Sequence, residues 1–253
     1  MDASNFKLIR EEFVGELDAI RQLVETFWGP GGNPKVRIAA ANSATLLVAA
    51  TFEEFVREMA RAYARMVVTT IPSFDKLPKK LVSTVWKRSM EGLARLSFDV
   101  EQFARESLTI ETRFSAAYSF VKGDLMQEIY QDLIHNENNM RPSELNSMFK
   151  VAGLSDMCAK VCQELALREF FGETEAGKAH GKLLAALDDF FERRNNIAHA
   201  LNPGQSSGPE QIIADLDMLN AFSLAMLQTL DNPTPRPTMT PNSAPATGPV
   251  STT

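Results

Sequence analysis

The spacing of apolar residues constrains this chain most, because they recur every three or four positions almost throughout its 253 residues. Side chains at this spacing share one face of an α-helix, and the strict alternation of a half-buried strand is hard to find. Because 44% of the residues are hydrophobic and 23% are charged, the chain resembles an ordinary globular protein that can bury a core. The sequence therefore predicts an all-α fold, an up-and-down helical bundle with additional helices.

Breaks in the apolar pattern divide the chain into successive helices. The strongest break is the run from Gly29 to Pro34, which is rich in glycine and proline. Arg141-Pro142-Ser143-Glu144 is typical of a helix start, because proline and an early acid are favoured in the first turn. The expected helices cover residues 4–28, 35–70, 79–96, 99–110, 114–135, 143–151, 155–171, 174–200 and 210–230.

Three regions follow from these breaks and from composition. Residues 1–34 form an N-terminal helix with its glycine- and proline-rich linker, and residues 35–230 form the main helical domain. Among residues 231–253, six are proline and eight are serine or threonine. Such a segment buries too little apolar area to offset the cost of ordering, so we expect a disordered tail. A proline-rich ligand for a partner protein is the alternative for this tail.

The charge balance excludes one class of nucleic-acid-binding protein. The formal net charge of −6 gives no broad basic field, which argues against a protein that coats duplex DNA. An enzyme that meets RNA through one local groove remains compatible with it. The N-terminus has early acids and no long apolar run, and the most apolar stretch, residues 38–52, is shorter than a membrane span. We expect a soluble, cytoplasmic protein that does not bind membranes.

Several common catalytic sites are absent from the sequence. There is no glycine-rich phosphate loop followed by lysine, and no Gly-x-Ser-x-Gly nucleophile motif. Cys158 and Cys162, four residues apart, are expected to be buried thiols in a reducing compartment.

The remaining polar clusters offer little metal chemistry. Asp132, His135 and Glu137 are the one local metal-ligand candidate, and a solvated asparagine-rich loop explains them better. His180 has no acidic or cysteine neighbour in register and is expected at the surface. We predict neither a metal nor another cofactor.

The third histidine, His199, lies close in sequence to residues that could act with it in catalysis. Residues 190–200 read FFERRNNIAHA, near the end of an amphipathic helix. Histidine is the side chain most often used to move protons in enzymes, so His199 can serve as a general acid or base, and Arg194 can hold a phosphate by two hydrogen bonds. Asn195, four residues before the histidine, shares its helix face and can fix its ring. Arg194 and His199 are about 140° apart on an ideal helix, so they converge only if the helix loosens, the arginine wraps around, or a second protomer completes the site.

At these residues the chain resembles the HEPN superfamily, whose signature is an arginine, a polar residue and a histidine after four to six positions. Two further stretches are similar to the RiboL-PSP type of HEPN domain. One is the alanine-rich helix Ser43 to Met59, which carries TFEEFV, and the other runs from Arg141 to the glycine-leucine pair Gly153-Leu154. The resemblance covers about residues 35–230.

The resemblance implies a helical HEPN bundle that dimerises so that both arginine–histidine pairs line one cleft. It implies a metal-independent endoribonuclease of toxin–antitoxin or anti-phage defence systems, with RNA as substrate and an antitoxin or defence protein as possible partner. In this interpretation His199 transfers protons, Arg194 binds the phosphate and Asn195 positions the histidine. Arg193 assists or replaces Arg194 at the phosphate. From the second helix, Glu53 or Glu54 pairs with these arginines, or serves as a structural or solvated carboxylate.

Two alternatives remain open at this point. The same fold can serve without catalysis, as an adaptor or as an RNA- or nucleotide-binding subunit of a defence complex. In a purely structural helical protein, Arg193 and Arg194 would be the cationic last turn of a helix, which the helix dipole favours.

Overall fold

The computed structural model describes residues 4–28, 33–94, 100–134, 139–199 and 207–231, and every regular element within these ranges is helical. This confirms the all-α prediction. In chain order the elements are α1 (Ser4–Phe27), α2 (Pro34–Thr70), the 3-10 helix η1 (Phe74–Lys76), α3 (Lys79–Ala94), α4 (Val100–Val121), α5 (Tyr130–Leu133), α6 (Pro142–Val151), α7 (Met157–Val161), α8 (Leu165–Phe171), α9 (Ala176–His199) and α10 (Pro209–Asp231).

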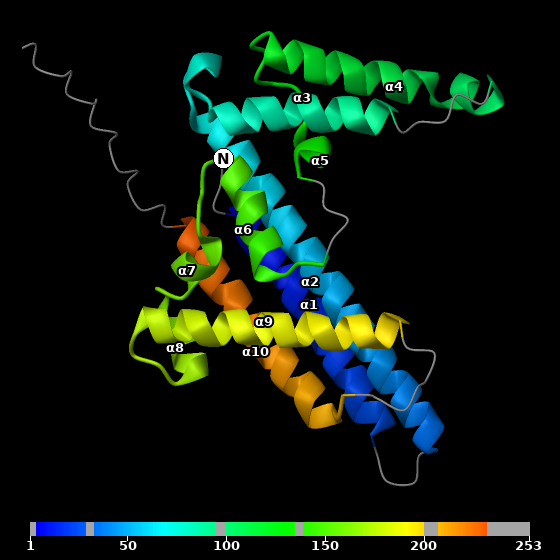
Figure 1. Ribbon diagram of the computed structural model, residues 1–253, viewed down its shortest axis with the longest axis vertical. Coiled ribbons are helices and arrows are strands. Elements are labelled where there is room, and N and C mark those ends of the chain that lie inside the picture. The colour runs from blue at the N-terminus through cyan, green and yellow to red at the C-terminus, as the bar shows by residue number, and fades with distance from the viewer. Residues whose placement is uncertain (1–3, 29–32, 95–99, 135–138, 200–206, 232–253) are drawn as a thin grey trace, which may run out of the picture.

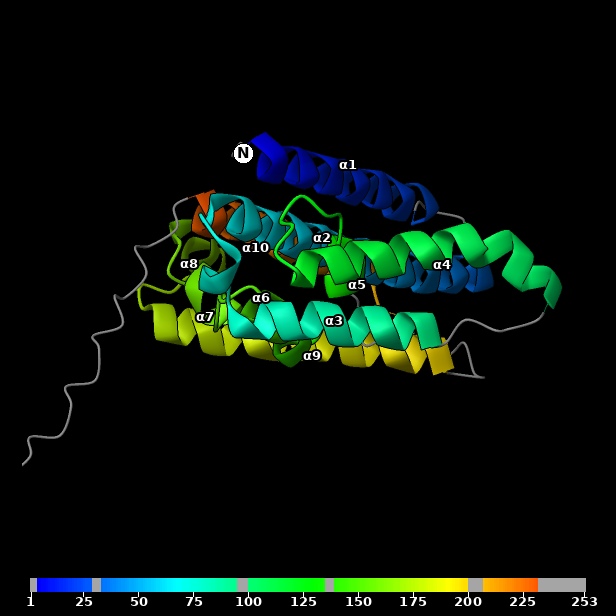
Figure 2. The ribbon, with the colours of Figure 1, turned by 90° about the horizontal axis from the view of Figure 1, so that it is seen from above.

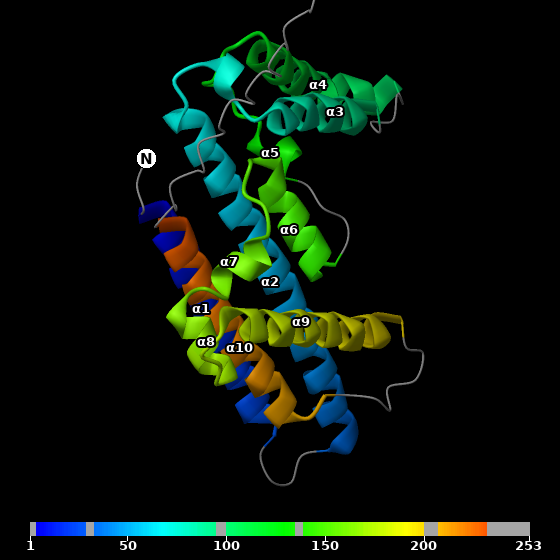
Figure 3. The ribbon, with the colours of Figure 1, turned by 60° about the vertical axis from the view of Figure 1, so that its left-hand side comes forward.

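Three long helices form the centre of the molecule. α1 and α2 make an antiparallel hairpin, and α10 runs beside them in the direction of α2 (Figures 1 and 3). The rings of Phe13 on α1 and Phe55 on α2 stack with centroids 4.2 Å apart, and Phe52 on α2 meets Phe222 on α10 edge-on at 5.5 Å. α1 therefore shares one hydrophobic core with the helices that follow it.

α2 begins where the sequence breaks. Asn33 is its N-cap, and the Asn33 side chain accepts a hydrogen bond from the Lys35 backbone amide at 2.9 Å. Pro34 follows at the first helical position, where a missing N–H costs nothing. The linker residues 29–32 themselves lie outside the described residues, as does the predicted tail from residue 232 onward.

α9 crosses the central helices at a steep angle, on the side opposite α1 (Figure 2). Its apolar stripe, which includes Leu183, Leu187, Phe190 and Phe191, is buried. The Phe191 ring lies 6.2 Å from that of Phe52 on α2. This contact fixes where the motif at the end of α9 emerges from the core.

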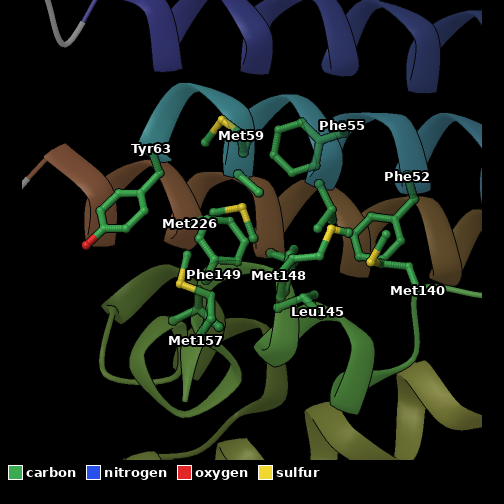
Figure 4. Close-up of a cluster of buried hydrophobic side chains, with 14 of the residues drawn as sticks. Phe52, Phe55, Met59, Tyr63, Met140, Leu145, Met148, Phe149, Met157 and Met226 are labelled. Carbon is green, nitrogen blue, oxygen red and sulfur yellow. The ribbon is translucent and has the colours of Figure 1, made fainter. Parts of the chain in front are cut away.

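The shorter helices α6 and α7 pack against the central helices, α6 on α2 and α7 on α10. Their buried methionines, leucine and phenylalanine pack against aromatic and methionine side chains of α2 (Figure 4). Cys158 and Cys162 are buried free thiols, as predicted, and burial raises the pKa of each to about 12. Neither thiol is a reactive nucleophile.

Two helix boundaries differ from the predictions. The segments expected at 99–110 and 114–135 are one helix, α4, which ends at Val121; Gly123 then adopts a φ of 106°, which favours glycine, and only the short α5 follows. The single helix expected over 155–171 is divided into α7 and α8. The turn between these two helices lets both of them contact α10.

α3 and α4 form a second hairpin beyond the end of α2, at a distance from the crossing of α9 (Figures 1 and 3). Arg113 on α4 forms an ion pair with Asp132 on α5, and Arg88 on α3 donates to the Leu133 carbonyl at 2.5 Å. Gly92 makes room for this arrangement, because a Cβ there would lie 2.8 Å from Nη2 of Arg113. Within the described residues, no helix has a stretch long and apolar enough to cross a bilayer.

Candidate functional site

The arginine–histidine motif occupies the last two turns of α9, where the helix projects beyond the bundle (Figure 1). Arg194 is half-buried and His199 is exposed. Because α9 keeps its helical geometry through His199, the two residues stay about 140° apart around the helix axis. The helix therefore does not loosen to bring them together. Convergence depends either on the reach of the arginine side chain or on a second copy of the chain.

Arg193 is held by carboxylates. Its Nη1 and Nη2 atoms donate to the two oxygens of Asp215 on α10 at 3.1 and 2.9 Å, and its Nε lies 3.2 Å from Asp189. The guanidinium carbon also lies 5.9 Å from the centroid of the Phe190 ring. This fork-to-fork pair joins α9 to α10 and occupies the Arg193 groups that a phosphate would need.

Asp215 is the buried member of this pair, with 7% of its side chain exposed. Burial raises its pKa to about 6, although Arg193 and a 3.1 Å hydrogen bond from Gln211 both act to lower it, and Asp189 adds to the rise. The Arg193 ion pair therefore offsets only part of the cost of burying this carboxylate.

Arg194 and Asn195 belong to a different cluster. The amide nitrogen of Asn139, just before α6, donates to the amide oxygen of Asn195 at 2.7 Å. Nη1 of Arg194 donates to the same oxygen at 3.3 Å. Two donors thus converge on Asn195, and they connect the segment before α6 to the motif turn. Asn195 and His199 share a helix face, as their four-residue spacing predicts.

Glu53 on α2 is the carboxylate beside Arg194. Its side chain is 14% exposed, and one of its oxygens has no hydrogen-bond partner among the described residues. Burial raises the pKa of Glu53, while Arg194, Arg57 and the Met140 backbone amide partly offset the rise. The approach of Arg194 to Glu53 is electrostatic, since no oxygen of Glu53 lies within 4.0 Å of it in the described structure.

Glu54 faces another surface. It pairs with Arg57 at 2.9 Å and Arg61 at 3.1 Å and lines a groove between α1 and α2. Partial burial acts to raise its pKa, but the two arginines outweigh this effect and lower it. Of the two glutamates, the structure brings only Glu53 to the motif.

The free groups of the motif suit phosphate chemistry. Nη1 of Arg194 donates to Asn195, and no carboxylate oxygen of the described residues lies within 4.0 Å of its guanidinium, so no ion pair among these residues occupies this cation. The exposed His199 imidazole is open to substrate as well. Arg194 can stabilise charge on a phosphate, and His199 can transfer a proton in the same region.

Metal-ligating side chains do not cluster in the parts of the chain that the structure describes. Asp132, which the sequence offered as a ligand, is paired with Arg113 instead. Its suggested companions His135 and Glu137 lie outside the described residues. His180 is half-exposed near the start of α9, more than four turns from His199.

Sequence reasoning missed Asn139. Asn139 and Asn195 are 56 residues apart, and this spacing does not predict their contact. The one available signal was its position at the end of a polar run, His135 to Asn139, immediately before a predicted helix start.

Comparison with protein families matches residues 5–232 to RiboL-PSP-HEPN. No curated protein and no solved structure matches the chain. HEPN proteins are typically ribonucleases. The match spans nearly all of the described helices, from α1 to α10, and includes the complete arginine–histidine motif. The chain belongs to the RiboL-PSP-HEPN family.

Proposed function

We propose that the protein is a metal-independent endoribonuclease in which Arg194 binds the scissile phosphate and His199 transfers protons. The ribose 2′-hydroxyl attacks the adjacent phosphorus and loses its proton, the bond from phosphorus to the 5′-oxygen breaks, and that oxygen takes up a proton. The products are a cyclic phosphate and a 5′-hydroxyl. DNA is not a substrate, because it lacks the attacking hydroxyl.

The observation that supports this proposal is the difference between the two adjacent arginines. Arg193 is bound on two sides by Asp215 and Asp189, whereas the Arg194 guanidinium has no carboxylate oxygen within 4.0 Å in the described structure. Arg194 is therefore the cation that can bind a phosphate. It lies on the same two helical turns as the exposed His199. Glu53 and Asn195 then serve as positioning residues for Arg194.

We further propose that the active species is a homodimer. The two catalytic groups point about 140° apart on one helix, so a second α9 that approaches the first can bring an arginine from one chain toward a histidine of the other. A toxin–antitoxin or anti-phage role, with an antitoxin or defence protein as partner, follows from the family as a proposal.

The decisive experiment is cleavage of labelled single-stranded RNA in EDTA by the wild type and by His199→Ala. We expect loss of about 10²- to 10⁴-fold in rate for the variant, the usual contribution of a general acid–base group. His180→Ala is the matched control, because it removes the same side chain from the same helix, about 28 Å away along its axis.

Product analysis completes the test. A cyclic phosphate end and a 5′-hydroxyl end are expected, and a single 2′-deoxy substitution at the cleaved nucleotide should abolish cleavage. Full activity of His199→Ala, or activity only with added metal, would refute the proposed mechanism. RNA binding with no cleavage by the wild type would instead point to the non-catalytic adaptor.

A further inference from the structure

A hollow of about 450 Å³ lies between η1, α3 and α4. It belongs to the α3–α4 hairpin, which does not carry the arginine–histidine motif. Its walls are mainly apolar and include Phe74, Val82 and Val121. Its size falls within the range of small-molecule sites. A hollow of this volume has room for a flat ring.

Exposed aromatic rings border the hollow. Trp86 on α3 is 39% exposed and Tyr118 on α4 is 46% exposed, and both line it. Phe114, one turn before Tyr118, stacks on the Tyr118 ring with centroids 6.0 Å apart and planes 13° apart. Large aromatic side chains that are exposed to solvent next to one another indicate a binding surface. Such rings stack unpaired nucleic-acid bases regardless of base identity.

Lysines accompany these rings. Lys79 lines the hollow, and the Lys122 ammonium lies 5.6 Å from the centroid of the Tyr118 ring. Neither lysine has a carboxylate within 4.0 Å among the described residues. On α3, Lys87 pairs with Glu91 and Arg88 donates to the Leu133 carbonyl, so Lys79 and the exposed Lys80 are the lysines of this helix without a described carboxylate within 4.0 Å, although the whole chain is acidic. Asp75, also at the hollow, can accept a hydrogen bond from the N–H edge of a base.

Two side-chain contacts connect the hairpin to α5. The Arg113–Asp132 ion pair ties α4 to α5, and Arg88 ties α3 to the same short helix. The hairpin lies beyond the end of α2, whereas α9 crosses α2 lower down (Figure 3). A ligand in the hollow would therefore be separate from the motif.

We propose that this hollow binds an unpaired base of single-stranded RNA, with Trp86 and Tyr118 stacking on it and Lys79 and Lys122 holding the flanking phosphates. The proposal rests on the proposed function for RNA as the ligand. It gives this acidic protein a local basic and aromatic patch for its substrate, away from the site of cleavage. Aromatic stacking and lysine charge together favour RNA over a purely apolar protein partner.

Tryptophan fluorescence tests the proposal in a chain that cannot cut the probe. In a Trp28→Phe, His199→Ala variant, Trp86 is the remaining tryptophan. We expect single-stranded oligouridylate to quench its fluorescence. Tyr118→Ala should weaken binding by about tenfold. Phe170→Ala is the control for Tyr118→Ala, because Phe170 on α8 is also a partly exposed aromatic ring, 39% against 46%, and should have no effect.

Salt dependence separates the phosphate contacts from stacking. Lys79→Ala and Lys122→Ala should each reduce the slope of log affinity against log salt by about 0.7. Absence of quenching, or unchanged affinity in Tyr118→Ala, would overturn the proposal. A fluorescence change that depends on protein concentration without RNA would also overturn it, and would identify an interface between copies of this chain.

The two proposals fail separately. Quenching by RNA without any cleavage by the wild type would count against the ribonuclease and support the RNA surface. Cleavage that depends on His199, together with no response of Trp86, would count only against the surface on the hairpin.

Discussion

Asn139 and Asn195 are joined by a 2.7 Å hydrogen bond from the amide nitrogen of the former to the amide oxygen of the latter. The same oxygen accepts from Arg194. The segment before α6 thereby helps to set the orientation of the proposed phosphate-binding side chain, although it carries no reacting group.

Asn139→Ala should lower the rate of RNA cleavage about tenfold, because small displacements of a positioned group are costly in catalysis. The lost hydrogen bond should cost about 1 kcal/mol of stability. Steady-state kinetics should show the loss in kcat more than in KM. Asn220→Ala, which removes a 3.2 Å hydrogen bond from Arg10 between α1 and α10, is the control. Equal effects of both variants on kcat would contradict a positioning role for Asn139.

The two arginines of the motif should separate stability from activity. Arg193→Ala leaves the buried Asp215 carboxylate without its partner, so we expect a loss of about 3 kcal/mol in the free energy of unfolding at pH 7. Arg194→Ala should cost less, about 1 kcal/mol, because it removes the hydrogen bond to Asn195 and part of the positive charge beside the partly buried Glu53. It should instead reduce cleavage about 10²- to 10³-fold.

Urea denaturation and RNA cleavage measured on the same two preparations check this pair. A stable but inactive Arg193→Ala, together with an active Arg194→Ala, would show that the assignment is reversed. Because the two residues are adjacent on one helix, each variant serves as the control for the other.

The helical framework was predictable because its long elements carry unbroken apolar stripes. α1, α2, α9 and α10 all follow the three- and four-residue spacing, and Asn33-Pro34 marks the start of α2. The short helices were harder, because α7 and α8 turn between neighbours that the local sequence does not specify. Tertiary contacts with α10 decide that turn.

The site was only partly predictable for the same physical reason. The motif supplied Arg194, Asn195 and His199 as neighbours in sequence. Which arginine is free depends on Asp215, which reaches α9 from another helix 22 residues along the chain. Glu53, and not Glu54, approaches Arg194 because of the way α2 is oriented about its own axis against α9. Local spacing does not determine that orientation.

Titration of Asp215 should make the free energy of unfolding depend on pH. Its pKa is about 6 in the folded chain and about 3.9 in an unfolded one. Because the folded state holds the proton more tightly, this group stabilises folding most below about pH 4, and the contribution is lost as pH rises to 6. The loss amounts to up to about 3 kcal/mol.

Asp215→Asn has no such proton to lose. The difference in unfolding free energy between the wild type and this variant, measured in urea from pH 4 to pH 7, should therefore move against the wild type as pH rises. A constant difference across that range would show that burial does not raise the pKa of Asp215.

A site shared between two chains can be tested by mixing two inactive variants. Arg194→Ala retains His199, and His199→Ala retains Arg194. If each site takes its arginine from one chain and its histidine from the other, a mixed dimer has one intact site, and an equal mixture after subunit exchange should recover about a quarter of wild-type activity. Mixing Arg194→Ala with the Arg194→Ala, His199→Ala double variant should recover nothing. Light scattering confirms that dimers are present, and dimers without recovery would place both groups of each site in one chain.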